Sequence, residues 1–540
     1  MDRQDEHTPL LPAGHGTGLS TSNSEYDPPL VCADTEAGPT QTTRRALPLI
    51  ILACTTLFVF NVGDQFLRSP QVRIYEDIIC RRYYESHGGS QLYPAGQQIP
   101  EEKCKIAPVE SELALIRGFE PLFDAIPSLL AAIPMGMLAD NPKIGRKPII
   151  LAALIGSLAQ MAWVTAVTWF SDALPLRWVW AGSVFLVTGG SEVTNAILYT
   201  MIIDITPSTE LASTFFTMQL VGSWMPVLVA PPIVSALMLN AGNWLPFSIG
   251  LFLSLCGFTL LCFAPETIKA HHVRPAKISE SQTATANSET SSIASDVAGP
   301  TIQRLIARIT DHTHQFIESS SFVFNSPHLI ILICSLMMST VSALRAMEMV
   351  VYYASARYSI AIAKSNLLNT VNAIVSISIL SSLPFASAFL TKKLGLSSQR
   401  KDLLVARVSV IMFAIGWSGV GLAPTLPFAI AALVVGTLGS GFSGSVRSLS
   451  ASYVEPHHQA RLASFVALMS AVGNFVGSPL LAGLYRFGLS MGDPAWYGLP
   501  FMGLGTMFAV VAGALWLVVR LPEDGEPVIV DEDRPGGGVE

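Results

Sequence analysis

Charged side chains are scarce in this sequence. Lys, Arg, Asp and Glu make up 13% of its 540 residues, whereas a soluble globular protein carries roughly 25%. Apolar residues make up 50%, and the mean hydropathy is +0.48. The charges gather in the two tails, in two long loops and in the stretch 140–147. This composition excludes a disordered chain and a nucleic-acid-binding protein, which needs a basic face, and predicts a membrane protein.

Signatures of nucleotide-driven and hydrolytic chemistry are also missing. The sequence holds no Walker A motif, no G-x-S-x-G and no H-E-x-x-H. The segment 439–444 reads GSGFSG and matches G-x-G-x-x-G, but it lies inside an apolar run, where small residues let helices pack closely. We therefore expect neither an ATP-driven pump nor an enzyme, and we expect no cofactor and no metal site.

Long apolar runs are what the sequence has in abundance. About 20 such residues cross the roughly 30 Å hydrocarbon core of a bilayer. We predict an all-α membrane protein with twelve transmembrane helices, six on each side of a polar break at 265–326. They cover approximately 46–67, 113–138, 148–170, 177–203, 212–238, 243–264, 327–355, 366–391, 402–422, 425–453, 462–486 and 496–520.

The distribution of Lys and Arg predicts the orientation. With the N-terminus in the cytoplasm, the short inner loops hold ten Lys and Arg residues and the short outer loops hold four. The excess favours both termini inside. The loop 68–112 then lies outside although it carries Arg73, Arg81 and Arg82, and its length weakens the rule there.

The chain divides into two similar halves. Six identities starting at Leu211 and Leu462 share one offset, and both copies open the fifth helix of their half. We predict a disordered cytoplasmic tail (1–45), a six-helix half (46–264), a cytoplasmic linker (265–326), a second pseudo-symmetric six-helix half (327–520) and an acidic tail (521–540). Apolar residues at helical spacing in 301–318 favour an amphipathic helix in the linker over a plain linker.

The segment 136–147 reads GMLADNPKIGRK and follows the second predicted helix. A carboxylate facing a guanidinium at a helix end makes a charge-assisted contact that motion can break. The segment resembles the loop 2–3 signature of the major facilitator superfamily, although Asn141 departs from it. The resemblance covers about 46–520 and implies a secondary transporter with a cytoplasmic latch, formed here by Gly136, Asp140, Gly145, Arg146 and Lys147. The alternative is an ordinary positively charged inner loop.

Other signatures of that superfamily are absent. Phe185 stands where many members have Arg in the fourth helix, and the segment 230–235 reads APPIVS where drug/proton antiporters have G-P-x-x-G-G. The segment 204–207 and a long outer loop with cysteines are similar to fungal relatives of the proton-coupled folate and haem-carrier branch. A disulfide between Cys80 and Cys104 is expected in that loop, which faces the oxidising side.

Charges inside predicted helices cost several kcal/mol, so each is a candidate for function. A buried carboxylate can exchange protons near neutral pH, and an arginine can face a substrate anion. The alternative is a set of fixed ion pairs, which we favour for Arg117 and Glu120. Asn366, Asn369 and Asn372 are spaced three residues apart and could bind substrate or bridge helices. The candidates for proton coupling or substrate binding are Asp64, Asp124, Glu192, Asn195, Arg345, Glu348, Asn369 and Arg447.

Together these features predict a fungal secondary transporter that moves a small organic molecule by alternating access, driven by protons. Efflux of a secondary metabolite or toxic compound is the first hypothesis. Uptake of a nutrient or cofactor anion is the second, and a non-transporting receptor is a third. We expect a monomer in a lipid bilayer that binds no nucleic acid. The plasma membrane is favoured, although the acidic dileucine pattern near Leu10 and Leu11 would also suit a vacuolar or endosomal membrane.

Overall fold

The computed structural model describes residues 39–87, 99–139, 144–206, 214, 217–263, 266, 326–394, 397–454 and 459–519. All regular structure in these ranges is helical, which confirms the all-α fold class. Three predictions lie outside the described residues: the tails over 1–38 and 521–540, the amphipathic helix over 301–318 and the placement of Asp140. Residues 39–45, predicted as the end of the disordered tail, instead belong to the first helix.

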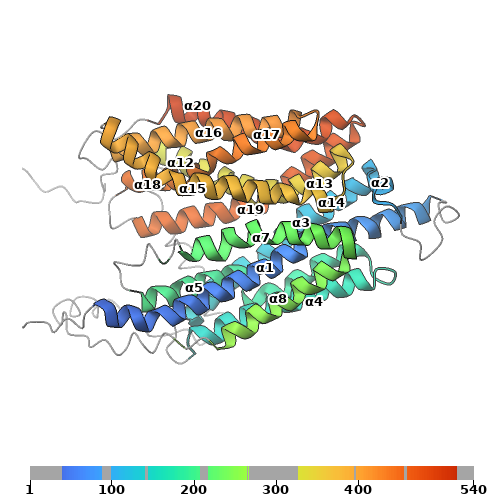
Figure 1. The fold of residues 1–540 in the computed structure, drawn as a ribbon, viewed down its shortest axis with the longest axis horizontal. Helices are drawn as coiled ribbons and strands as arrows, with labels where there is room; N and C mark the ends of the chain where they lie inside the picture. Colours follow the sequence, from blue (N-terminus) through green and yellow to red (C-terminus); the bar gives the residue numbers. More distant parts are fainter. Residues whose placement is uncertain are drawn as a thin grey trace, which may run out of the picture.

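The first half of the chain forms one group of helices, drawn in blue to green in Figure 1. These are α1 (Pro39–Ser86), α2 (Glu101–Cys104), α3 (Ala107–Ala139), α4 (Arg146–Trp169), η2 (Leu176–Thr188), α5 (Gly190–Ile205), η3 (Leu220–Trp224), α7 (Met225–Ala241) and α8 (Trp244–Cys262). We call this group the N-bundle.

The second half forms another group, drawn in yellow to red in Figure 1, and we call it the C-bundle. It consists of α12 (Pro327–Val341), η5 (Ser342–Ala346), α13 (Met347–Tyr358), α14 (Ile362–Ser365), α15 (Leu367–Leu394), α16 (Ser398–Leu422), α17 (Leu426–Thr437), η6 (Leu438–Gly441), α18 (Phe442–Ser452), α19 (Gln459–Ser490), η8 (Pro494–Gly498) and α20 (Leu499–Leu517). Helices α3 and α7 of the N-bundle lie against α19 and α15 of the C-bundle.

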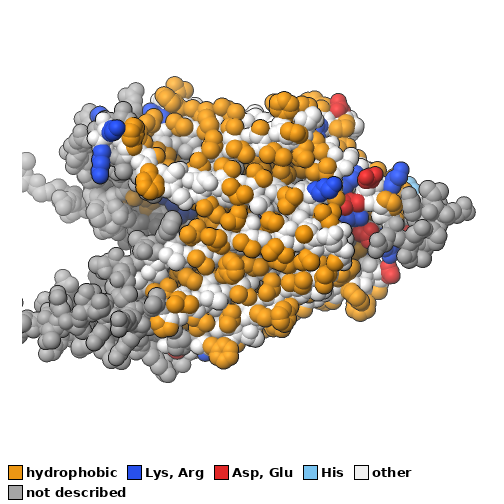
Figure 2. Space-filling model, viewed as in Figure 1, with side chains coloured by type: hydrophobic (Ala, Val, Ile, Leu, Met, Phe, Trp, Pro, Cys, Tyr) orange, Lys and Arg blue, Asp and Glu red, His pale blue; other side chains and the backbone are white. Residues whose placement is uncertain are grey.

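Every predicted apolar run contains helix in the part of the chain that the structure describes. Ten helices there are long and apolar enough to cross a membrane. Apolar side chains also cover the face shown in Figure 2, as a lipid-facing surface requires. The chain is therefore a multi-pass membrane protein, and the count of twelve spans stays a prediction.

The first helix differs most from its prediction. Helix α1 continues to Ser86, so much of the expected loop 68–112 is helical. Pairs at i, i+4 spacing, such as Arg81 with Asp77 at 3.6 Å, support this part of the helix. Tyr75 on the same segment is fully buried. A hydropathy window ends where charges begin, but a helix whose charges are paired can continue beyond the bilayer.

A disulfide and an ion-pair cluster fasten the end of α1 to α2. Cys80 and Cys104 are bonded, with Cα atoms 5.4 Å apart. We call this side of the molecule the disulfide end, and the side where α1 begins the tail end (Figure 1). The neighbouring outer cluster links Lys105 to Glu101 at 3.3 Å and Arg73 to Glu101 at 3.4 Å, and its members are Arg73, Glu76, Glu101, Lys105 and Glu110.

The outer cluster predicts a pH-dependent stability. Burial, opposed by Lys105 and reinforced by the Glu76 carboxylate, raises the pKa of Glu110 from 4.5 to about 8. The protonated acid therefore favours the folded state, and this contribution is complete below pH 4.5 and lost as the pH rises through about 8. We expect the melting temperature in detergent to fall by on the order of 5 °C between about pH 6 and pH 9.

The Glu110→Gln protein should lack most of that fall, because its amide does not titrate. The matched control is Glu112→Gln. Glu112 lies on the same helix as Glu110, but its carboxylate is 30% exposed and pairs with Arg177 of η2. That control should keep the fall. An unchanged pH dependence in Glu110→Gln would contradict the assignment.

Candidate functional site

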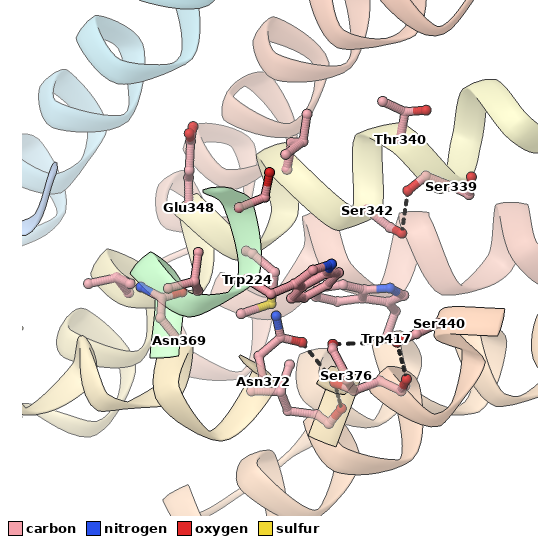
Figure 3. A pocket seen from close by; sticks show the side chains of 18 of the residues that line it. Trp224, Ser339, Thr340, Ser342, Glu348, Asn369, Asn372, Ser376, Trp417 and Ser440 are labelled. Atoms are coloured by element: carbon pink, nitrogen blue, oxygen red, sulfur yellow. Dashed lines mark hydrogen bonds between the residues drawn. The ribbon is translucent and has the colours of Figure 1, made fainter. Parts of the chain in front are cut away.

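A cavity of about 500 Å³ lies between the two bundles. Both bundles contribute to its wall, with α1, α3 and η3 on one side and η5, α13, α15 and α16 on the other (Figure 3). Its wall combines four charged side chains with amides, hydroxyls and two tryptophans. They include Arg68, Arg117, Glu348, Arg447, Gln65, Gln219, Ser342, Asn369, Asn372, Ser376, Ser440, Trp224 and Trp417.

A chain of ion pairs crosses from one bundle to the other beside this cavity. Arg68 on α1 donates to Asp64 at 2.7 Å and also to the Glu348 carboxylate on α13. Arg345 donates to the second oxygen of Glu348 at 3.0 Å. Glu348 thus holds two guanidiniums, one from each bundle, and we call these four residues the bridging network. Arg68 was not among the predicted site residues.

The other predicted pair stays within the N-bundle. Arg117 and Glu120 on α3 meet at 2.7 Å, and both side chains are 13% exposed. Gln71 on α1 donates to the same carboxylate at 3.3 Å and to Tyr75 at 2.6 Å. Arg117 also faces the cavity, so one end of this pair is within reach of a ligand.

Asp124 and Asn195 lie apart from the cavity wall. The Asp124 carboxylate accepts hydrogen bonds from Gln160 and Ser183, each at 2.6 Å, inside the N-bundle. Asn195 lies on α5 and is exposed. The backbone of Glu192 belongs to the same helix, and its side chain lies outside what the structure describes.

The three asparagines of the eighth predicted apolar run, 366–391, make different contacts: two line the cavity and one joins the bundles. Asn369 and Asn372 line the cavity, and Asn372 accepts from Thr437 at 2.9 Å. Asn366 instead bridges the bundles, because it accepts from Ser69 at 2.7 Å and donates to the Pro231 carbonyl at 3.2 Å. It is 3% exposed and cannot meet a ligand in this arrangement.

Further contacts between the bundles gather on the disulfide side of the cavity. The Glu101 carboxylate of α2 accepts from the Ile362 backbone N–H at the start of α14, at 2.7 Å. Arg486 on α19 donates to Ser111 on α3 at 3.0 Å. The described contacts therefore close the cavity toward the disulfide end.

At the tail end, the segment 136–147, which we call the latch segment after its predicted role, is held by a residue that the sequence pattern did not reveal. The Glu266 carboxylate accepts from the backbone N–H groups of Arg146 and Lys147, at 3.1 and 2.9 Å. It thereby satisfies the free donors at the start of α4, where the helix dipole favours negative charge. The side chains of the two basic residues reach the carbonyls of Thr200 and Cys262, so the segment joins α4 to α5 and α8.

Two short π-helical turns, η3 and η5, face the cavity from opposite bundles. Such turns insert one extra residue into a helix and often occur at functional sites. The G-x-G-x-x-G segment spans the end of the 3-10 turn η6 and the start of α18. A Cβ on Gly439 would lie 2.7 Å from the Ser409 carbonyl oxygen. That glycine serves close helix packing.

Helices that surround a cavity between two bundles, closed toward one end of the molecule, define a membrane transporter. The sequence comparison is more specific: residues 123–401 match the Major Facilitator Superfamily, and the chain belongs to that family. The chain is 32% identical over 493 residues to the MFS efflux pump atnC of Emericella nidulans, with 90% of each chain covered. It is 28% identical over 455 residues to the efflux pump ustT of Aspergillus flavus, with 83% of each covered.

Solved structures agree on the fold. The D-xylose–proton symporter superposes with a TM-score of 0.56 at 12% identity, covering 89% of this chain and 98% of that one. The nucleoside transporter NupG gives 0.55 at 11% identity, covering 87% of this chain and 98% of that one. These likenesses show the fold, and the family identifies the chain as a transporter and not an enzyme.

Proposed function

We propose that this transporter exports a small organic molecule, a fungal secondary metabolite, by proton-coupled alternating access. The observation that carries the proposal is the cavity lined by both bundles and closed toward the disulfide end. The curated relatives named as efflux pumps support the direction of transport. The protein would act as a monomer in the plasma membrane, with a vacuolar or endosomal membrane as the alternative.

Alternating access requires the contacts on the disulfide side to break while the tail end closes. The bonds of Asn366, Glu101 and Arg486 are few and polar, and water can replace each of them once the bundles separate. The latch of Gly136, Asp140, Gly145, Arg146 and Lys147 would hold the tail end closed in the other state.

Glu348 is the best placed carboxylate to carry the coupling proton. Its protonation would weaken its bonds to Arg68 and Arg345 at once and so loosen the bridge between the bundles. Asp124 is bonded to neutral partners within one bundle, so its protonation would change no contact between the bundles. Glu192 remains a competing candidate.

The test is transport into inside-out vesicles with an acidic interior, using a fungal metabolite extract as the source of compounds. We expect at least one compound to accumulate several-fold above vesicles without the protein, and a protonophore to abolish the accumulation. Accumulation only when the gradient is reversed would favour uptake. If no compound moves under either gradient, the proposal is wrong.

A further inference from the structure

Two tryptophans face the cavity from opposite bundles. Trp224 ends the π-helical turn η3 of the N-bundle, and Trp417 lies in α16 of the C-bundle. Figure 3 shows both indole rings extending into the same part of the cavity, toward one another. The π-turn accounts for the orientation of Trp224, since the inserted residue rotates the side chains that follow it relative to a continuous α-helix.

Trp417 is held rigidly and keeps one unused donor. Its ring stacks on Phe501, with ring centroids 5.7 Å apart and planes inclined by 8°. The side chain is 5% exposed, and its Nε1–H has no hydrogen-bond partner among the described residues. The Nε1 atom is itself covered in this arrangement, so an acceptor in the cavity reaches it only when the side chains beside it shift. Because a buried donor left unpaired costs about 1–3 kcal/mol, that new hydrogen bond would recover energy.

Amides and hydroxyls surround the tryptophans on the C-bundle side. Asn372, Ser376 and Ser440 line the cavity near Trp417, and Asn369 lines it on the side of Trp224 (Figure 3). These groups suit carbonyl and hydroxyl oxygens, whereas the flat faces of the two indoles suit a conjugated ring. The combination is selective, because a saturated ring lacks the flat π-face and a bare hydrocarbon lacks the oxygens.

We propose that Trp224 and Trp417 form the recognition site for a flat aromatic compound that carries carbonyl or hydroxyl groups, one of which accepts from Trp417 Nε1. This substrate class rests on the proposed export function. Because each bundle supplies one indole, separation of the bundles during transport would dismantle the site and release the compound.

The test is equilibrium dialysis of the full chain in lipid nanodiscs, with binding to empty nanodiscs subtracted. The probes are 1,8-dihydroxyanthraquinone, 7-hydroxyflavone and 7-hydroxycoumarin, and the saturated ketone 2-decalone is the comparison. We expect at least one flat probe to bind about tenfold more tightly than 2-decalone. Trp224→Ala should weaken that probe about tenfold, and Trp417→Phe, which keeps a ring but removes the N–H, about fivefold.

Two controls separate recognition from folding. Trp224→Phe retains an aromatic ring and should bind within about twofold of wild type, and Trp169→Ala changes an exposed residue at the end of α4 and should have no effect. The inference is overturned if no flat probe binds more tightly than 2-decalone, or if Trp224→Ala and Trp417→Phe both bind like wild type. Neither result touches the export proposal, which fails separately if the vesicles move no compound.

Discussion

The Glu348→Gln protein should open toward the disulfide end much more often than wild type. Glu348 is the carboxylate that holds Arg68 of α1 and Arg345 of η5 together, and its side chain is 25% exposed. A glutamine amide keeps an oxygen that can accept a hydrogen bond, but it loses the attraction between a carboxylate and two guanidiniums. We take this loss as about 1.5–3 kcal/mol, the contribution of a hydrogen bond to a charged group. The loss should shift the ratio of the two states by about 10- to 100-fold, since each 1.4 kcal/mol is a factor of ten.

The measurement is the labelling rate of a cysteine introduced at Val72, which lines the cavity and is 4% exposed. A membrane-impermeant maleimide added from the disulfide side should react faster in Glu348→Gln by the same factor. The protein without the introduced cysteine supplies the background from native thiols. Transport driven by a pH gradient should fall at the same time, because the bridge no longer depends on a proton.

Glu120→Gln is the matched control. It also removes a carboxylate from an i, i+3 pair with arginine, but Arg117 and Glu120 both belong to α3, and the pair does not join the bundles. Its labelling rate at Val72 should stay close to that of wild type. Equal rates in Glu348→Gln and wild type would show that the bridging network does not hold the disulfide end closed.

Local spacing in the sequence correctly predicted one ion pair of the bridging network. An i, i+3 spacing places two side chains on one helix face, and the structure brings Arg345 to 3.0 Å from Glu348. The third partner, Arg68, is 280 positions away in the sequence and lies one residue beyond the predicted end of the first helix. Hydropathy placed that end just before the charge of Arg68. The i, i+4 spacing offers Asp64 as a local partner, but only the packing of the bundles shows that Arg68 also meets Glu348.

The all-α fold was predictable because each long apolar run must satisfy its backbone as a helix in lipid. The family resemblance depended instead on the segment 136–147. The π-turns were not predictable, since the single extra residue in η3 or η5 leaves hydropathy unchanged. Glu266 was equally hidden, because it lies in the polar break and finds its donors about 120 positions away. Trp224 and Trp417 read as ordinary apolar residues until the structure placed them on one cavity.

Replacing Gly145 by alanine should damage the latch segment severely. Gly145 has φ 87° and ψ 173°, a conformation that only glycine adopts readily, and its strain costs on the order of 1–3 kcal/mol in other residues. An added Cβ would also lie 2.5 Å from the Glu266 Oε2 atom. That contact would displace the carboxylate from the start of α4, and loss of such a cap costs about 0.5–2 kcal/mol more.

We expect Gly145→Ala to lower the melting temperature by several degrees and transport by at least about tenfold, measured in detergent and in vesicles respectively. Gly136→Ala is the control from the same motif, because its Cβ would meet no atom of the described residues within 4 Å and its φ is negative. It should match wild type in both assays.

The double variant Gly145→Ala/Glu266→Ala separates the two causes: it relieves the contact but keeps the backbone strain and removes the cap. It should therefore remain as impaired as the single variant. If it recovers wild-type transport, Glu266 does not stabilise the latch segment and acts only as a neighbour that the new side chain strikes.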